Sequence, residues 1–186
     1  VAILPEGMSR ERFDWLRSIA GQVIATPGCE SNVKEIFDKA NELKRQPHMM
    51  VFNQFEEMGN HLWHYQVTGD AIATVFEHVK RPGDRMAGAC FTSGSAGTIG
   101  CGDYLKEQYP AMRLAVGEAL QCPTILNNGF GGHRIEGIGD KHIPWIHNVK
   151  NTDMVIAIDD EDSQRLLRLF SDPAGLRYLR MEAGVD

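Results

Sequence analysis

TSGSAGT, residues 92–98, lies between an apolar run at 86–91 and a run with helical spacing that continues to about Gln108. This order predicts a buried strand, a tight turn of small residues and then a helix. Amide N–H groups without partners converge at such a helix N-terminus, where the helix dipole also favours negative charge. The stretch therefore predicts an anion site, to which the hydroxyls of Ser93, Ser95 and Thr98 can add donors. It is equally consistent with a strand-to-helix turn whose residues are small because the turn is crowded.

The alternation of strands and helices continues along the chain. Apolar runs predict further strands at 1–4, 23–25, 49–52, 113–118 and 154–158. Helical spacing predicts helices that begin at Ser9, near Ser31, at Asp70, at Asp159 or Asp160, and at Pro173. Because the connections are short, this order predicts an α/β fold with mostly parallel sheets covered by helices. The longest loop, 119–136, is rich in glycine, and a loop of that length is more often functional than idle.

Composition and charge exclude several classes of protein. The 186 residues are 42% hydrophobic and 24% charged, which is typical of a soluble globular domain. A net charge of −6 without a basic block argues against a nucleic-acid or anionic-membrane partner. No membrane-length apolar run or signal peptide is visible, so a cytoplasmic protein is expected. The scattered cysteines are expected to be reduced, with Cys90 buried in its apolar run.

The two ends of the sequence predict that it is part of a longer polypeptide. Residues 1–4 already form an apolar strand, and residues 184–186 resemble a helix stop followed by the start of another strand. A complete domain usually ends at its surface. The fold is therefore expected to be incomplete at both ends.

Several motifs, taken in order, resemble the cysteine synthase and cystathionine β-synthase family. LPEGMS at 4–9 resembles the family's M-P-E-x-M-S segment, and TPG at 26–28 resembles its T-x-G turn. NQF at 53–55, followed by Asn60 and by HYQVTG at 64–69, is similar to N-Q-F-x-N-P-x-N…H-Y-x-T-T-G. Further motifs that resemble this family are GSAGT at 94–98 for the phosphate loop G-T-G-G-T, VGE at 116–118 for V-E-P, and HRIEGIG at 133–139 with IP at 143–144 for H-K-I-Q-G-I-G-x-x-F-I-P.

The resemblance implies a fold and a cofactor. The family is fold type II of the pyridoxal phosphate enzymes, the tryptophan synthase β-like group, with a three-layer α/β sandwich of mostly parallel sheets. Residues 1–55 would be part of its smaller, mobile N-terminal domain, and 56–186 part of its larger domain, which binds the cofactor phosphate. The cofactor-binding residues implied are Gly94, Ser95, Ala96, Gly97 and Thr98 around the phosphate, and Gly137 and Gly139 beside the pyridoxal ring.

The resemblance also implies a reaction. It is pyridoxal phosphate-dependent β-elimination or β-replacement on an amino acid, with cysteine synthase-like sulfhydrylation in cysteine biosynthesis as the first expectation. Gln54 would face the substrate carboxylate or the O3′ side of the cofactor. Ammonia elimination or dehydration of serine, threonine or diaminopropionate remains an alternative on the same fold. The complete protein is expected to be a homodimer.

The Schiff-base lysine of the family is expected outside residues 1–186. It precedes the M-P-E segment in the family, and no lysine here stands in its context. The lysines present are read as exposed helix or loop residues: Lys34, Lys39, Lys44, Lys80, Lys106, Lys141 and Lys150. The chain alone is therefore predicted to be inactive.

Departures from the family pattern indicate a divergent branch. Ala96 replaces a glycine of the phosphate loop, so one backbone conformation is restricted there. The proline expected after Glu118 is absent, and so is the N-P-A-N sequence after Gln54-Phe55.

Other functional classes leave weaker signals. His61 and His64 are three residues apart, and His133, His142 and His147 lie close in sequence, but none has a partner at a recognised metal spacing, so no metal is predicted. Neither Ser93 nor Ser95 completes the G-x-S-x-G elbow of a hydrolase. The G-x-G-x-x-G of a nicotinamide-binding domain is also missing. A non-catalytic phosphate- or nucleotide-binding Rossmann-like module stays open as an alternative.

Overall fold

The structure is a computed structural model that describes residues 1–29 and 31–185. Its N-terminal part consists of β1 (Ala2–Pro5), α1 (Arg10–Ile19), β2 (Val23–Thr26) and α2 (Val33–Lys44). The two strands pair in parallel, with Ala2 opposite Val23. The predicted cap of α1 is confirmed, because the Ser9 side chain accepts the Arg12 N–H. Helix α2 buries the predicted apolar positions Val33, Ala40 and Leu43.

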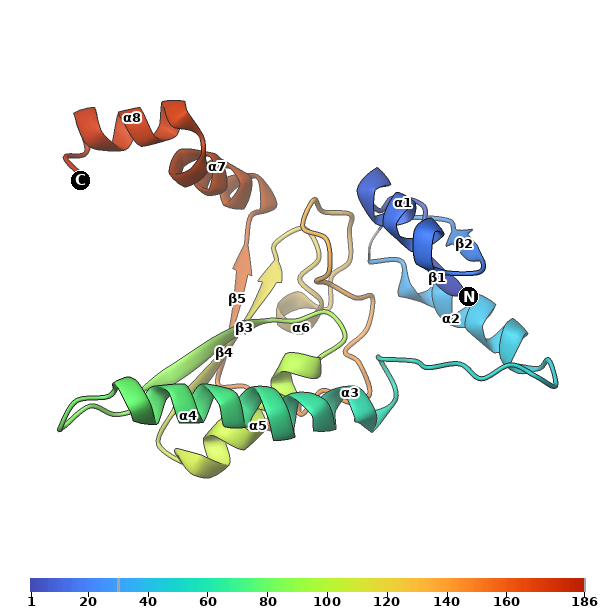
Figure 1. The fold of residues 1–186 in the computed structure, drawn as a ribbon, viewed down its shortest axis with the longest axis horizontal. Helices are drawn as coiled ribbons and strands as arrows, with labels where there is room; N and C mark the ends of the chain where they lie inside the picture. The colour runs from blue at the N-terminus through green and yellow to red at the C-terminus, as the bar shows by residue number, and fades with distance from the viewer. Residues whose placement is uncertain (30, 186) are drawn as a thin grey trace.

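An irregular segment, 45–57, links this part to the rest of the chain (Figure 1). The strand predicted at 49–52 is wrong. Met50 and Phe52 are 78% and 83% exposed, and the small sheet contains only β1 and β2 among the residues described. An apolar run without a neighbouring strand edge cannot form ladder hydrogen bonds, so apolarity alone did not make it a strand.

A long helical rod follows, in which α3 (Met58–Trp63), a π-helical segment η1 (His64–Gly69) and α4 (Asp70–Val79) are continuous. The predicted helix over 70–79 is confirmed, whereas the rod's start at Met58 had no sequence prediction. The rod packs across α5 (Gly97–Gln108), as Figure 1 shows. Small residues allow this close approach, since a Cβ added to Gly69 would lie 2.8 Å from the Tyr104 side chain.

The larger sheet is parallel and has the order β3-β4-β5. Its strands are β3 (Gly88–Thr92), β4 (Arg113–Ala119) and β5 (Met154–Ile158), and the remaining helices are α6 (Thr124–Asn127), η2 (Val149–Asn151), α7 (Asp160–Ser171) and α8 (Pro173–Glu182). Fully buried Leu114 and Val116 of the central strand and Ile99 and Leu105 of α5 form the core between sheet and helix. The predicted cap Asp159 precedes α7, and α8 begins at Pro173 as predicted, with Asp172 as its cap.

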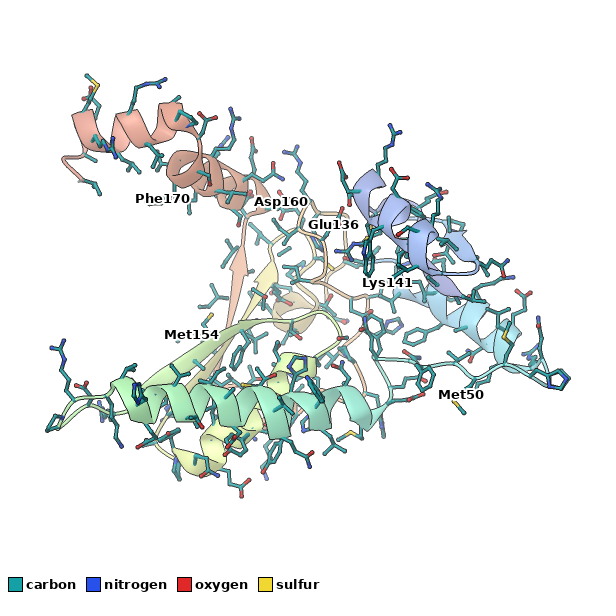
Figure 2. All side chains as sticks on the ribbon, viewed as in Figure 1. Met50, Glu136, Lys141, Met154, Asp160 and Phe170 are labelled. Atoms are coloured by element: carbon teal, nitrogen blue, oxygen red, sulfur yellow. The ribbon has the colours of Figure 1, made fainter. Side chains whose placement is uncertain are left out.

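One face of this sheet is open in the part of the chain that is described. The strands predicted to be buried at 86–91 and 154–158 instead alternate between exposed and half-buried residues, and Cys90 is exposed. Helices α7 and α8 pack on each other and project beyond the sheet (Figure 1), so Met154 on the strand and Phe170 on α7 both remain exposed (Figure 2). Apolarity predicted these strands, but burial depends on which face another element covers.

Two further features concern the hydrophobic helices and the cysteines of the described residues. No helix among them is long and apolar enough to span a bilayer. The four cysteines are free, and burial raises the pKa of the Cys101 thiol to about 11.

Candidate phosphate and cofactor site

The small-residue stretch connects the end of β3 to the start of α5. Within the described residues, the amides of 94–98 donate to no protein acceptor. They therefore lie at a helix N-terminus with their hydrogen-bonding capacity free, which is the geometry that holds an anion.

Ala96 adopts the left-handed backbone conformation, with φ 64° and ψ 13°. This conformation costs free energy for alanine but not for the glycine that the family has here. Its methyl group is 1% exposed and packs with Ile99, Val116 and Ile146. The burial of this methyl offsets part of the backbone strain, which explains how an alanine is accommodated here.

The three hydroxyls predicted as extra donors differ in their hydrogen-bond partners. Thr98 Oγ1 donates to the Thr92 carbonyl at 3.1 Å, so its proton is directed at the backbone in this structure. Ser93 Oγ is buried, with no protein partner in the described residues. Ser95 Oγ accepts a hydrogen bond from Asn60 Nδ2 at 3.1 Å and lines a cavity. Ser95 is therefore the hydroxyl best placed to contact a ligand.

Gly137 and Gly139 belong to a second glycine-rich segment, which packs against the loop at 92–98. Their φ values of +90° and +84° favour glycine, and the Gly139 N–H donates to the Ser93 carbonyl at 3.2 Å. A Cβ added to Gly94 would lie 2.9 Å from the Gly137 carbonyl oxygen. The two glycine segments, predicted from separate motifs, thus meet backbone to backbone.

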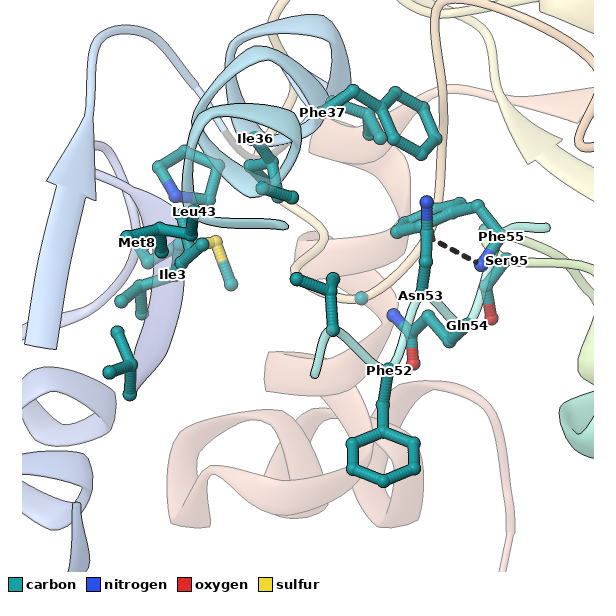
Figure 3. Close-up of a pocket in the computed structure, with 18 of the residues that line it drawn as sticks. Ile3, Met8, Ile36, Phe37, Leu43, Phe52, Asn53, Gln54, Phe55 and Ser95 are labelled. Atoms are coloured by element: carbon teal, nitrogen blue, oxygen red, sulfur yellow. Dashed lines mark hydrogen bonds between the residues drawn. The ribbon is translucent and has the colours of Figure 1, made fainter. Parts of the chain in front are cut away.

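A cavity of about 590 Å³ lies between these glycines and the N-terminal part of the chain (Figure 3). Gln54 and Ser95 both line it, together with Gly94, Gly137 and Gly139. Ala96, the N-cap of α5, and Gly97 and Thr98 in its first turn do not line it. The volume suits a small-molecule ligand. No lysine of the described residues lines the cavity.

Asn60 is a site residue that the sequence interpretation did not single out. Its Nδ2 donates to the Gln54 carbonyl at 3.0 Å and to Ser95 Oγ at 3.1 Å. A Cβ added to Gly97 would overlap Asn60 Oδ1 and lie 2.7 Å from His64 Cδ2. The signal was available, because Asn60 and His64 both stand in the N-Q-F…H-Y motif.

Polar contacts join the N-terminal part to the glycine-rich segment. Glu136 Oε1 accepts the Ser9 N–H at 2.7 Å, and Glu136 Oε2 lies 3.4 Å from Arg12 Nε. Two further contacts have the same role: Ser31 Oγ with His133 Nε2 at 2.9 Å, and Lys141 Nζ with Glu35 Oε1 at 3.7 Å. Glu136 and Lys141 face the N-terminal part in Figure 2. These hydrogen bonds and ion pairs thus hold the N-terminal part against the glycine-rich segment.

Two carboxylates near the site have structural partners. Glu118 is buried and accepts the N–H groups of Ile125 and Leu126, each at 2.9 Å, so it caps α6 although the usual proline is missing. Burial raises the pKa of Asp140 above its ordinary range, and His142, at 3.5 Å, opposes the shift only in part.

The lysines differ in how exposed their side chains are. Lys34, Lys44, Lys80 and Lys150 are exposed, as predicted. Lys39, Lys106 and Lys141 are instead half-buried, so the prediction is wrong for these three. The Lys106 ammonium group is 2.5 Å from Asp153, and its side chain is only 18% exposed. Lys106, the Leu114 N–H and Arg113 hold the pKa of Asp153 well below its usual range.

The histidines have separate partners and do not meet at one point. His61 lies 3.5 Å from Asp103, His64 bonds Thr68, and His133 bonds Ser31. Among the residues described, no group of three or more His, Cys, Asp or Glu side chains is arranged to hold a metal ion.

Comparison with known proteins was made on sequence and structure. No family model matches the chain. A probable cysteine synthase of Bacillus subtilis is 30% identical over 178 residues, which are 95% of this chain and 56% of that protein. A cysteine synthase of Staphylococcus aureus is 29% identical over 177 residues, 95% of this chain and 55% of that protein. Over nearly its whole length the chain is similar to enzymes of the cysteine synthase and cystathionine β-synthase family. It spans about half the length of these relatives.

The fold of the chain is confirmed by solved structures. The O-acetylserine-dependent cystathionine β-synthase of Helicobacter pylori superposes with a TM-score of 0.74 at 27% identity, covering 98% of this chain and 55% of that one. A hydrogen sulfide-producing enzyme of Fusobacterium nucleatum gives 0.76 at 27% identity, covering 90% and 51%. The tryptophan synthase β-like fold predicted from the motifs is therefore correct, and the family's enzymes depend on pyridoxal phosphate.

Proposed function

We propose that the complete protein is a pyridoxal phosphate-dependent enzyme that performs β-replacement or β-elimination on an amino acid, with cysteine synthase-like sulfhydrylation as its reaction. The observation that carries the proposal is that Gly94 and Ser95, which begin the run of free amides at 94–98, line one cavity together with Gln54 and the Gly137 and Gly139 backbone. Similarity to cysteine synthases and to an O-acetylserine-dependent cystathionine β-synthase supports the reaction class.

The loop fits the phosphate group of the cofactor. The backbone N–H groups of Gly94, Ser95, Ala96, Gly97 and Thr98 would donate to its oxygens, and the positive end of the α5 dipole would favour its charge. Glycine at 137 and 139 leaves room for the pyridoxal ring against the backbone. When bound, the cofactor supplies the electron sink for loss of the α-proton and of the β-substituent.

Gln54 would bind the substrate carboxylate. Its side chain is exposed to the cavity, and its backbone carbonyl is fixed by Asn60. An amide N–H donor held in this way orients a carboxylate without a competing charge. Replacement by alanine should weaken amino-acid binding more than it lowers stability.

The wider proposals concern organisation. A division into a smaller domain over 1–55 and a larger one from 56 onward is supported by the irregular segment 45–57. Family resemblance supports a homodimer, and the net charge of −6 supports a small amino-acid substrate rather than nucleic acid, in a cytoplasmic protein.

The experiment that tests the phosphate loop compares Ser95→Asp with Ser95→Asn in the complete protein. The two side chains have the same shape, so they differ in the charge placed beside the free amides. Pyridoxal phosphate affinity, measured by absorbance titration, should fall about 100-fold or more in Ser95→Asp and much less in Ser95→Asn. Equal affinities for the two variants, with unchanged circular dichroism, would contradict the assignment.

A further inference from the structure

Asn60, at the start of the helical rod, holds together the two segments to which the proposed function assigns substrate and cofactor. Its Nδ2 donates one hydrogen bond to the Gln54 carbonyl at 3.0 Å and a second to Ser95 Oγ at 3.1 Å. Gln54 precedes it by six residues, whereas Ser95 follows thirty-five residues later. Figure 3 shows Gln54 and Ser95 next to each other on the wall of the cavity.

The partner at Gln54 fixes which way the Asn60 amide points. A backbone carbonyl oxygen is an acceptor only, so the group that faces it must be the NH₂ end of the amide. The opposite end, Oδ1, lies over Gly97, where an added Cβ would overlap it. The orientation of Asn60 is therefore set on both sides.

This orientation decides the direction of the Ser95 hydroxyl. Because Ser95 Oγ accepts a hydrogen bond from Asn60, its own single O–H proton must point away from Asn60. Ser95 lines the cavity, and the neighbouring Thr98 hydroxyl already donates to the Thr92 carbonyl. Ser95 is thus left as a hydroxyl donor toward whatever anion the loop amides hold.

We propose that Asn60 is a positioning residue, which holds the Ser95 hydroxyl as a donor to the cofactor phosphate and ties the Gln54 segment to the phosphate loop. The inference rests on the proposed function, because it takes the anion to be that phosphate. Asn60 acts through Ser95 and need not contact the cofactor.

A double-mutant cycle on the complete protein tests this role. The variants are Asn60→Ala, Ser95→Ala and the double variant, and the measured quantities are the dissociation constants of pyridoxal phosphate and of pyridoxal, which lacks the phosphate. A hydrogen bond to a charged group corresponds to roughly a tenfold change in affinity. We expect Asn60→Ala to weaken pyridoxal phosphate binding about tenfold and pyridoxal binding less than about twofold.

The cycle separates positioning from a general structural effect. If Asn60 acts through the Ser95 hydroxyl, the double variant should bind pyridoxal phosphate within about twofold of Ser95→Ala. Multiplicative losses, or an equal loss for pyridoxal, would overturn the inference. The isosteric Asn60→Asp guards against a misfolded alanine variant: its carboxylate would draw the Ser95 proton toward itself, so a loss at least as large as that of Asn60→Ala is expected. Wild-type affinity in Asn60→Asp would also overturn it.

The wild-type protein provides the separate test of the proposed function. A clear preference for pyridoxal phosphate over pyridoxal shows that the loop binds the phosphate, whatever the variants do. Absence of that preference would overturn the phosphate assignment itself, and with it the role of Asn60.

Discussion

The N-terminal part of the chain, 1–44, and the part from α3 onward are built in different ways. The first has a two-stranded sheet, and its helix α1 has no fully buried residue. The second has a central strand and a helix whose facing side chains, Leu114, Val116, Ile99 and Leu105, are completely buried. Close packing holds the phosphate loop, whereas Glu136 and a few other polar contacts hold the opposite wall of the cavity. The site thus combines one rigid wall with one that is bound weakly.

The largest effect should come from the core of the second part. Leu114→Ala removes a fully buried side chain that packs on Gly102, so the free energy of unfolding should fall by about 2–5 kcal/mol. Leu16→Ala on α1, where the residue is only half-buried, should lower it by about 1 kcal/mol. Urea unfolding of both variants measures the difference. Equal losses would show that the two parts have equally packed cores.

Asp153 should give the next largest effect, and it should depend on pH. Its carboxylate joins α5 to β4 through Lys106, Arg113 and the Leu114 N–H, and its pKa is lowered in the folded state. A lowered folded pKa contributes stability that is present above the unfolded value of about 3.9 and is lost as pH falls below it. Asp153→Asn should therefore lower the melting temperature at about pH 7, and the gap from wild type should shrink by about pH 3. A gap that stays constant across this range would assign the effect to packing instead of charge.

Glu136 tests the weakly bound wall. Glu136→Gln keeps an acceptor for the Ser9 N–H but removes the ion pair with Arg12, and should cost only about 0.5–1 kcal/mol. Hydrogen exchange should become faster in 1–44 while the amides of α5 stay protected. Glu136→Ala, which removes both contacts, should speed exchange further. A uniform increase over the whole chain would mean that the two parts open together.

Ala96→Gly should have the smallest effect. Relief of the left-handed strain, about 1–2 kcal/mol, is opposed by the loss of a buried methyl, about 0.8 kcal/mol, and by the greater freedom of glycine in the unfolded chain. The net change in unfolding free energy should lie within about 1 kcal/mol of zero. Ala96→Val, with a β-branched side chain at φ 64°, should be clearly destabilised and serves as the contrast. A large gain in stability from glycine would show that the methyl contributes little to the core.

The sequence by itself determined the features that depend on a few neighbouring residues. The cap at Ser9, the helix over 70–79 and the turn at 92–98 follow from local backbone preferences, and the structure contains all of them. The parallel sheets follow as well, because short alternating strand and helix units leave few other arrangements.

Only the tertiary structure decided which surfaces are covered and which polar groups meet. Residues 49–52 have the apolar pattern of a strand but no neighbouring edge, and Cys90 lies on the sheet face that no described element covers. The proton of Thr98 goes to the backbone, Asn60 reaches Ser95, and Glu136 reaches Ser9, 127 residues earlier in the chain. Pairing and burial are set by contacts between residues distant in sequence, and a local pattern does not contain the position of its partner.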